Sequence, residues 1–194
     1  MEAKQRIIPA IKTMKQFDAF LSSGYTIGVL LEVHIAQLKS IFAYARRHGK
    51  ELIIHVDLVQ GLSHDEHAAE YLCQEFRPHG LISTKAGVIM KARQKHVLAV
   101  QRIFLLDSHA LEKSYQLIAK TNPDCIEVIP GAMPHIIREV KERTGKPIYA
   151  GGLIRTPADV EQALEAGAAA VTTSNETLWR HYDRPRGEEA GGSC

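Results

Sequence analysis

The stretch PIYAGGLIRTPADVEQALEAGAAAVTTSN, residues 147–175, predicts two strands joined by a helix. Residues 148–150 form a short apolar run that suits a buried strand, and Gly151 and Gly152 follow it directly. A Thr-Pro pair then predicts a helix start, because Thr caps helix N-termini and Pro fits the first turn. After the helix, residues 168–171 predict a second strand that ends in a polar run.

Both strand ends carry residues suited to hold a phosphate group. Gly151 and Gly152 have no Cβ, so their backbone N–H groups can approach a ligand closely. Thr173 and Ser174 offer hydroxyls at the second strand end, and in (β/α)8 barrels the loops after strands seven and eight form the usual phosphate site. Arg155 either adds positive charge there or is a solvated loop residue. A lone glycine pair is more often a turn, but the combination predicts phosphate binding.

The rest of the chain repeats the strand-helix unit. This alternation implies parallel strands with right-handed crossovers, and eight units favour a closed barrel. The fold class predicted is therefore α/β, a compact (β/α)8 TIM-type barrel. A doubly wound open sheet is the alternative, and the lack of GxGxxG after the first strand counts against it. The predicted strands are 7–11, 26–31, 52–56, 81–83, 98–106, 125–129, 148–150 and 168–171.

Length and composition fit one globular domain. The chain has 194 residues, 45% of them hydrophobic and 24% charged, with a net charge of +2. We predict a single barrel domain over residues 1–182 and a disordered tail over 183–194. There is no apolar run of membrane-spanning length and no signal peptide, so we expect no membrane contact and a cytoplasmic protein. Three cysteines without a CxxC motif are consistent with reduced thiols.

Polar residues at other predicted strand ends point to a polyol. Glu32 follows the second strand, His55 and Asp57 end the third, and Glu127 lies within the sixth. Glu127 and His55 sit among apolar neighbours, where a charge is costly unless it is paired or bound to a ligand. We expect these four side chains to accept hydrogen bonds from the hydroxyls of a small polyol phosphate. Glu127 paired with a core Lys, Arg or His, and His55 hydrogen-bonded in the core, remain the alternatives.

The same residues are also compatible with an enzymatic function. Class I aldolase chemistry needs a desolvated lysine inside the barrel, but the sixth strand carries Glu127 instead. Metal-assisted phosphodiester hydrolysis needs clustered carboxylates, which Glu32, Asp57 and Glu127 would supply. A barrel phosphodiesterase acting on glycerol phosphodiesters or small sugar phosphates is therefore the alternative function. The pattern itself requires neither a metal nor a cofactor.

A basic stretch suggests a second kind of partner. Residues 77–106 contain six Lys or Arg and no Asp or Glu, which suits an RNA phosphate track. Cations near helix C-termini are the common structural alternative. Aromatic residues do not alternate with these cations, so base stacking is not expected. The predicted RNA-binding residues are Lys85, Lys91, Arg93, Lys95 and Arg102.

Six motifs over residues 6–179 together resemble the glycerol uptake operon antiterminator regulatory proteins of Gram-positive bacteria. They are HVDLVQGLSHDEHAAEYLCQE, ISTKAGVIMKARQK, QRIFLLDSHALEKS, IEVIPG, REVKERTGKPIYAGGLIRT and AVTTSN. The resemblance implies a regulator rather than an enzyme, with glycerol-3-phosphate as its effector. With ligand bound, such a protein acts on the leader mRNA of glycerol genes to prevent transcription termination. Whether the chain forms a homo-oligomer is left open.

Overall fold

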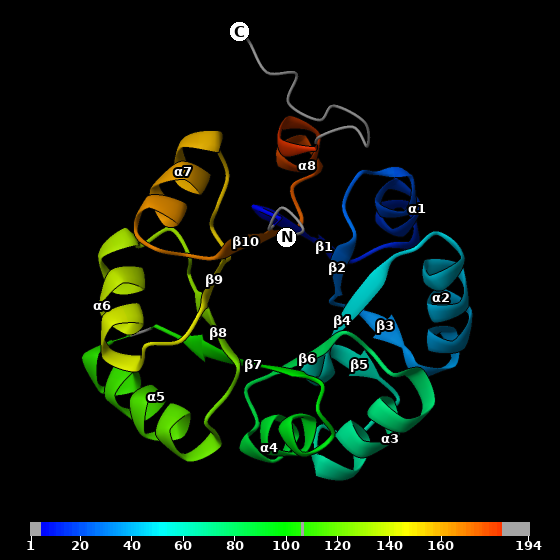
Figure 1. Ribbon diagram of the computed structural model, residues 1–194, viewed down its shortest axis with the longest axis horizontal. Helices are drawn as coiled ribbons and strands as arrows, with labels where there is room; N and C mark the ends of the chain where they lie inside the picture. Colours follow the sequence, from blue (N-terminus) through cyan, green and yellow to red (C-terminus); the bar gives the residue numbers. More distant parts are fainter. Residues whose placement is uncertain (1–4, 106, 184–194) are drawn as a thin grey trace, which may run out of the picture.

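The computed structural model describes residues 5–105 and 107–183, and in it eight parallel strands close into a barrel (Figure 1). The strand order around the ring is β1-β10-β9-β8-β7-β6-β4-β2, so the first and last strands of the chain are neighbours. This confirms the predicted (β/α)8 barrel. The barrel strands are β1 (Ile7–Ile11), β2 (Ile27–Leu30), β4 (Glu51–His55), β6 (Gly80–Ser83), β7 (Leu98–Phe104), β8 (Cys125–Ile129), β9 (Ile148–Gly151) and β10 (Ala170–Thr173).

Eight helices surround the described barrel as an outer ring (Figure 1). Helix α7 begins as predicted, because the Thr156 side chain accepts a hydrogen bond from the Asp159 amide and the Asp159 carboxylate accepts one from the Thr156 amide. None of the helices in the described ranges is long and apolar enough to cross a membrane. The helices are α1 (Met14–Ser22), α2 (Ile35–Arg47), α3 (Glu66–Phe76), α4 (Ala86–Gln94), α5 (Ser108–Thr121), α6 (Pro134–Thr144), α7 (Pro157–Glu165) and α8 (Glu176–Tyr182).

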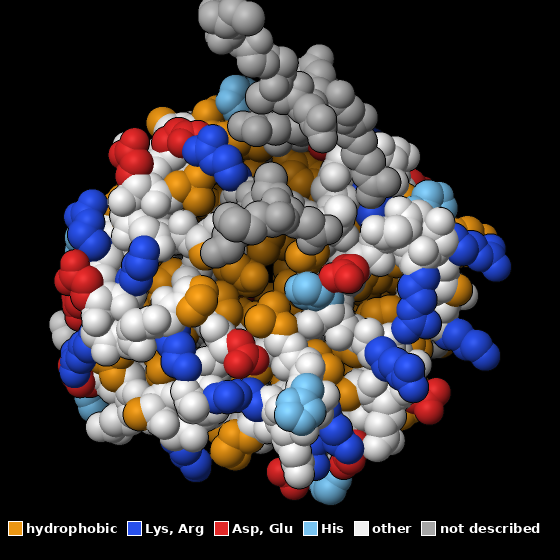
Figure 2. Space-filling view, in the orientation of Figure 1, with side chains coloured by type: hydrophobic (Ala, Val, Ile, Leu, Met, Phe, Trp, Pro, Cys, Tyr) orange, Lys and Arg blue, Asp and Glu red, His pale blue; other side chains and the backbone are white. Residues whose placement is uncertain are grey.

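Strand alternation divides the core into two layers. Leu52 and Ile54 of β4 pack in the large cluster shared with the helices, whereas Ile53 packs in a smaller cluster inside the barrel. Figure 2 shows hydrophobic side chains on the floor of the hollow at the centre of the ring. Residues two positions beyond the inner cluster face the same interior, one layer nearer the strand ends. That layer holds Ala10, Leu31, His55, Arg102, Glu127 and Thr172.

Some boundaries differ from the predictions. Two short strands, β3 (Val33–His34) and β5 (Val59–Gln60), pair beside the barrel, and a 3₁₀ helix, η1 (Val56–Leu58), follows β4. Strand β10 begins two residues later than predicted, because the Ala168 amide still donates to the Ala163 carbonyl at the end of α7. The alanine-rich run there has no alternation that could fix the start.

Aspartates cap two of the helices. The α3 cap is Asp65 and the α5 cap is Asp107. In both cases the carboxylate accepts a backbone N–H three residues on. The predicted tail lies outside the described residues except for Asp183, whose carboxylate accepts a hydrogen bond from the Gly24 amide.

Candidate functional site

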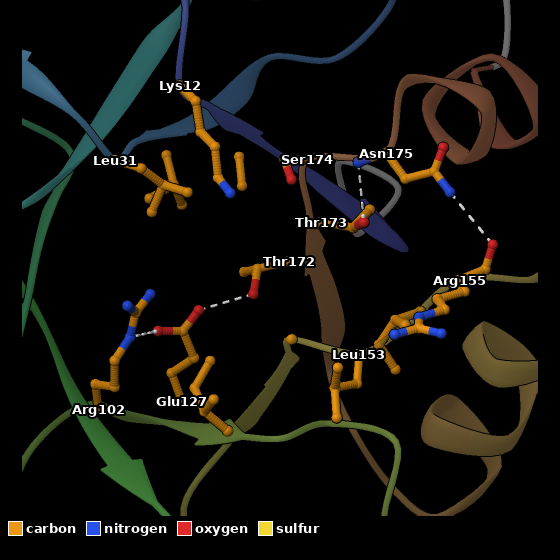
Figure 3. Close-up of a pocket in the computed structure, with 15 residues that line it drawn as sticks. Lys12, Leu31, Arg102, Glu127, Leu153, Arg155, Thr172, Thr173, Ser174 and Asn175 are labelled. Atoms are coloured by element: carbon orange, nitrogen blue, oxygen red, sulfur yellow. Dashed lines mark hydrogen bonds and ion pairs between the residues drawn. The ribbon is translucent and has the colours of Figure 1, made fainter.

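A cavity of about 340 Å³ opens at the carboxyl ends of the strands, mainly those of β1, β2 and β7 to β10 (Figure 3). Its walls include the tips of β9 and β10, which are hydrogen-bonded neighbours with Thr172 in register with Gly151. The two strand ends predicted from the sequence to form one site therefore do lie together, with open space between them. The labelled lining residues are Lys12, Leu31, Arg102, Glu127, Leu153, Arg155, Thr172, Thr173, Ser174 and Asn175.

The loops after β9 and β10 are tied to each other by Asn175. Its side-chain amide donates to the Arg155 carbonyl at 3.2 Å, and its backbone N–H donates to Thr173 Oγ1 at 3.2 Å. Among the described residues, the backbone N–H groups of Gly152 and Ser174 have no hydrogen-bond acceptor. The two loops thus hold two free amides and the Thr173 hydroxyl at the cavity wall, a donor set suited to an anion.

The two glycines after β9 have different roles. Gly152 lines the cavity and has φ +72°, a conformation that favours glycine. Gly151 is absent from the lining, and a Cβ on it would lie 2.5 Å from Thr172 Oγ1 and 3.1 Å from Glu127 Oε1. Gly151 therefore makes room for a buried hydrogen-bond network, a reason different from the ligand approach that we predicted for it.

Gly131 fixes the same loop from the side of β8. Its N–H donates to the carbonyl of Gly151 at 2.5 Å and to that of Gly152 at 3.1 Å. A Cβ on Gly131 would lie 2.6 Å from the Gly151 nitrogen, so a larger residue would push the two backbones apart.

Glu127 anchors the floor of the cavity. Its carboxylate is 1% exposed and accepts hydrogen bonds from Arg102 Nε at 2.6 Å and Thr172 Oγ1 at 2.7 Å (Figure 3). The alternative that Glu127 pairs with a core cation is therefore confirmed. Arg102, predicted as an RNA-binding residue, lines the cavity instead and is 12% exposed. The reason is alternation: Arg102 follows the interior residue Val100 by two positions.

Lys12, which the sequence analysis missed, points into the cavity from the end of β1 (Figure 3). Its backbone N–H donates to Gln16 Oε1 at 2.9 Å, and the Gln16 amide donates to the Ser174 carbonyl at 3.1 Å. Within the described part of the chain, neither the Lys12 ammonium nor the Arg155 guanidinium has a hydrogen-bond or ion-pair partner. The position of Lys12 directly after the first predicted strand is the only feature of the sequence that indicated a place at the cavity.

The charges around the cavity do not cancel. Lys12, Arg102 and Arg155 line it together with one carboxylate, that of Glu127. Two positive charges are therefore uncompensated within the lining, which favours a ligand carrying about two negative charges, such as a phosphate monoester.

Asp57 and Glu32 do not line this cavity. The Asp57 carboxylate accepts hydrogen bonds from the Ser83 hydroxyl and from the Thr84 amide and hydroxyl, the last two at 2.8 Å. Burial raises the pKa of Asp57, but these hydrogen bonds outweigh it and lower the pKa below its usual range. Glu32 lines a smaller crevice beside α1 and α2. The expected cluster of four polyol-binding residues is therefore not assembled around one cavity.

His55 is enclosed inside the barrel. It is 2% exposed, and neither ring nitrogen has a hydrogen-bond partner in the described structure. Burial, with the positive charge of Arg102, lowers its pKa to about 4, so the imidazole is neutral near pH 7. The alternative of a hydrogen-bonded core histidine is therefore wrong as far as the described residues show.

The carboxylates required by the phosphodiesterase alternative are separated. Glu127 is bound to Arg102, Asp57 is bound at the end of β6, and Glu32 lies at another crevice. No group of three or more His, Cys, Asp or Glu residues that could hold a metal ion occurs in residues 5–105 and 107–183.

The basic stretch is largely paired with acids from other elements. Glu70 of α3 pairs with Lys91 at 3.3 Å and Lys95 at 2.5 Å, and Asp124 lies 3.7 Å from Arg93. The stretch itself has no acidic residues, but in the structure acidic residues of other elements lie next to its cations. Of the five predicted RNA-binding residues, Lys85 is the one with an exposed side chain and no partner within the described chain.

An α/β barrel with a cavity of this size at the carboxyl ends of its strands has the architecture in which such barrels commonly hold small ligands. Residues 7–179 match the family model described as "Glycerol-3-phosphate responsive antiterminator", and the chain belongs to this family. The family resemblance predicted from the motifs is thus confirmed.

Three similar proteins cover nearly the whole chain. A glycerol uptake operon antiterminator regulatory protein from Listeria monocytogenes is 45% identical, with a TM-score of 0.90 over 92% of this chain and 97% of its own. An antiterminator-related protein of the glycerol uptake operon from Thermotoga maritima is 28% identical, with a TM-score of 0.81 over 92% and 99%. The uncharacterised protein YgcP of Escherichia coli is 32% identical over 89% of this chain and 91% of its own.

Proposed function

We propose that this protein binds glycerol-3-phosphate in the cavity at the strand ends and, with ligand bound, binds the leader mRNA of glycerol-utilisation genes to prevent transcription termination. Membership of the glycerol-3-phosphate responsive antiterminator family supports the effector. The structural observation that carries the proposal is the pair of positive charges, Lys12 and Arg155, that no carboxylate of the lining compensates around a cavity of about 340 Å³. This size is at the small end for ligand sites and suits a three-carbon phosphate.

The phosphate of the ligand binds at the loops after β9 and β10 in this proposal. The free amides of Gly152 and Ser174 donate to it, the Thr173 hydroxyl contributes, and Lys12 and Arg155 supply charge. Gly151 does not contact the phosphate in this proposal. Its missing side chain leaves room for the hydrogen bond between Thr172 and Glu127 beneath the phosphate.

The glycerol end of the ligand lies toward the interior. Arg102 donates to Glu127 through Nε, so its terminal nitrogens remain for a hydroxyl, and the second lone pairs of the Glu127 carboxylate accept one. His55, which is 2% exposed and does not line the cavity, is not assigned a contact with the ligand. Asp57 and Glu32 are not needed for this arrangement, since neither lines the cavity.

The binding step is tested by calorimetry with glycerol-3-phosphate, glycerol and inorganic phosphate as separate titrants. We expect glycerol-3-phosphate to bind most tightly, and Lys12→Ala to weaken it about tenfold through loss of one charge-assisted hydrogen bond. Lys39→Ala is the matched control, because Lys39 is an exposed lysine on α2 outside the cavity. Equal affinities for the wild type and Lys12→Ala would exclude this mode of binding.

The regulatory step is tested by titrating leader RNA with and without glycerol-3-phosphate. A ligand changes RNA affinity only if it binds the RNA-competent and RNA-incompetent states differently, so we expect a clear difference between the two titrations. Equal RNA affinity in both would end the proposal of a responsive regulator. We place the protein in the cytoplasm, where leader transcripts are made.

The hydrolase alternative is tested on the same samples. Incubation with glycerol phosphodiesters, with and without magnesium, should release no product if the site only senses its ligand. Turnover that is lost in Glu127→Gln would favour the enzyme instead.

A further inference from the structure

An exposed aromatic side chain stands on the barrel rim beside the cavity. Phe104 is the last residue of β7, lies two positions beyond Arg102 and is 47% exposed. Leu153, in the loop after β9, is 60% exposed and has φ +57°, an uncommon conformation for a residue with a side chain. Large apolar side chains held outward at a cavity mouth, one of them on a strained backbone, are typical of a binding surface.

The two apolar side chains are connected through β8. Phe104 is in register with Ile129, and Ile129 packs against the loop after β9, where a Cβ on Gly152 would lie 3.3 Å from its Cγ2. Ile129 and Leu153 both line the cavity. The exposed rim is therefore continuous with the wall of the ligand site.

Two cations, each without an ion-pair partner within the described ranges, flank these side chains. Lys85 follows β6, the strand next to β7, and its turn is fixed because Asp57 binds Ser83 and Thr84 while the Lys85 amide donates to Ser83 Oγ at 2.9 Å. Arg155 lies on the other side, two residues beyond Leu153. Two carboxylates near this arc are engaged in capping: Asp107 caps α5, and Asp159, beside Arg155, accepts hydrogen bonds from the Arg155 and Thr156 amides.

We propose that this rim, composed of Lys85, Phe104, Leu153 and Arg155, binds a single-stranded segment of RNA. Phe104 is the platform on which one base stacks, and the two cations contact flanking phosphates. The inference rests on the proposed function and identifies the surface that performs its RNA-binding step. It leaves out Lys91, Arg93 and Lys95 of the predicted RNA-binding set, because these are paired with Glu70 and Asp124. Because Leu153 and Arg155 line the cavity as well, the ligand and the RNA share one loop.

The test is fluorescence anisotropy with labelled leader RNA and with a 20-nucleotide single-stranded fragment of it, at saturating glycerol-3-phosphate. We expect Phe104→Ala to weaken RNA binding about tenfold, the loss typical of one stacked base, and Phe104→Tyr to restore it. Lys85→Gln should reduce the slope of log affinity against log salt by about 0.7, the value for one phosphate contact on a single strand. Calorimetry should show unchanged glycerol-3-phosphate binding in all three variants.

Two control variants place similar changes away from the rim. Tyr44→Ala removes an aromatic side chain that is 52% exposed on α2, and Lys39→Gln removes an exposed cation from the same helix. Wild-type RNA affinity in Phe104→Ala and Lys85→Gln, or an equal loss in the controls, would overturn the assignment. A Phe104→Ala variant that dissociates from dimer to monomer with RNA affinity intact would assign the rim to a second copy of the chain and overturn it too. If the wild type binds no RNA, the proposed function itself fails. The titration of the wild type shows this before any variant is compared.

Discussion

The two sides of the barrel mouth carry similar polar residues and use them differently. On the cavity side, at the ends of β1, β9 and β10, the Lys12 and Arg155 side chains have no hydrogen-bond or ion-pair partner among the described residues and line the cavity. On the closed side, the ends of β4 and β6, Asp57 is satisfied by Ser83 and Thr84 and His55 is enclosed. A polar residue at a strand end therefore indicates a site only if its hydrogen bonds and charge are not already used within the protein.

The buried pair between the two sides should give the largest effect when it is broken. Glu127→Ala leaves the Arg102 guanidinium without its carboxylate at a position that is 12% exposed, so we expect a loss of about 3–5 kcal/mol in the free energy of unfolding. Urea unfolding followed by circular dichroism measures it. Glu161→Ala, which breaks the exposed pair with Arg6, should stay close to wild type. A loss as small as that of the control would mean that the pair is not buried in solution.

His55, on the closed side, should make the free energy of unfolding decrease at acidic pH. The pKa of His55 is lowered from its ordinary 6.5 to about 4, chiefly by burial, with Arg102 lowering it further and Glu127 and Asp57 opposing. Between these values the unfolded chain binds a proton that the folded protein does not, so stability is full above pH 6.5 and falls toward pH 4. The loss is on the order of 3 kcal/mol.

This pH dependence is measured from unfolding curves between pH 7 and pH 4. His55→Asn should flatten the slope in that window, whereas His48→Asn, at an exposed position, should not. Identical slopes for the wild type and His55→Asn would show that other groups cause the acid sensitivity.

Asp57→Ala should show most clearly that the closed side supports stability whereas the cavity side binds the ligand. The change removes the acceptor for Ser83 and Thr84, so we expect a loss of about 2 kcal/mol in unfolding free energy. Glycerol-3-phosphate affinity should stay near the wild-type value, because Asp57 does not line the cavity. Lys12→Ala should do the reverse, with stability kept and affinity lost. A marked loss of ligand affinity in Asp57→Ala would restore our original expectation that it contacts the polyol.

The smallest effect concerns the loop that supports the cavity side. Gly131→Ala places a Cβ 2.6 Å from the Gly151 nitrogen, and relieving this contact should cost about 1.5 kcal/mol. Gly87→Ala is the control, because its Cβ would meet nothing closer than 3.7 Å and it lies in helix α4, where alanine is preferred. Thermal unfolding should rank the control at or above wild type and Gly131→Ala below it.

The sequence predicted those features that depend on local pattern. Strand and helix alternation gave the barrel, and the neighbouring ends of β9 and β10 followed from its topology. Glu127 was selected as a candidate site residue because a carboxylate among apolar residues must be paired or bound to a ligand. Neither inference needed knowledge of distant contacts.

The features that the sequence did not predict depend on contacts between distant elements. Glu70 neutralises Lys91 and Lys95 from another helix, 21 residues away in the case of Lys91. Lys12 looked like any exposed lysine, since only the closed ring places it opposite Arg102. Phe104 was overlooked because a strand residue is usually covered, and β7 extends far enough to leave it exposed.

The pairing of β1 with β10 has a consequence for synthesis of the protein. The cavity takes Lys12 from the beginning of the chain and Thr173 to Asn175 from near its end, and the ring closes only when these two strands meet. A chain still attached to the ribosome with β10 in the exit tunnel therefore has an incomplete cavity wall. The cavity is complete only after β10 has left the tunnel and paired with β1.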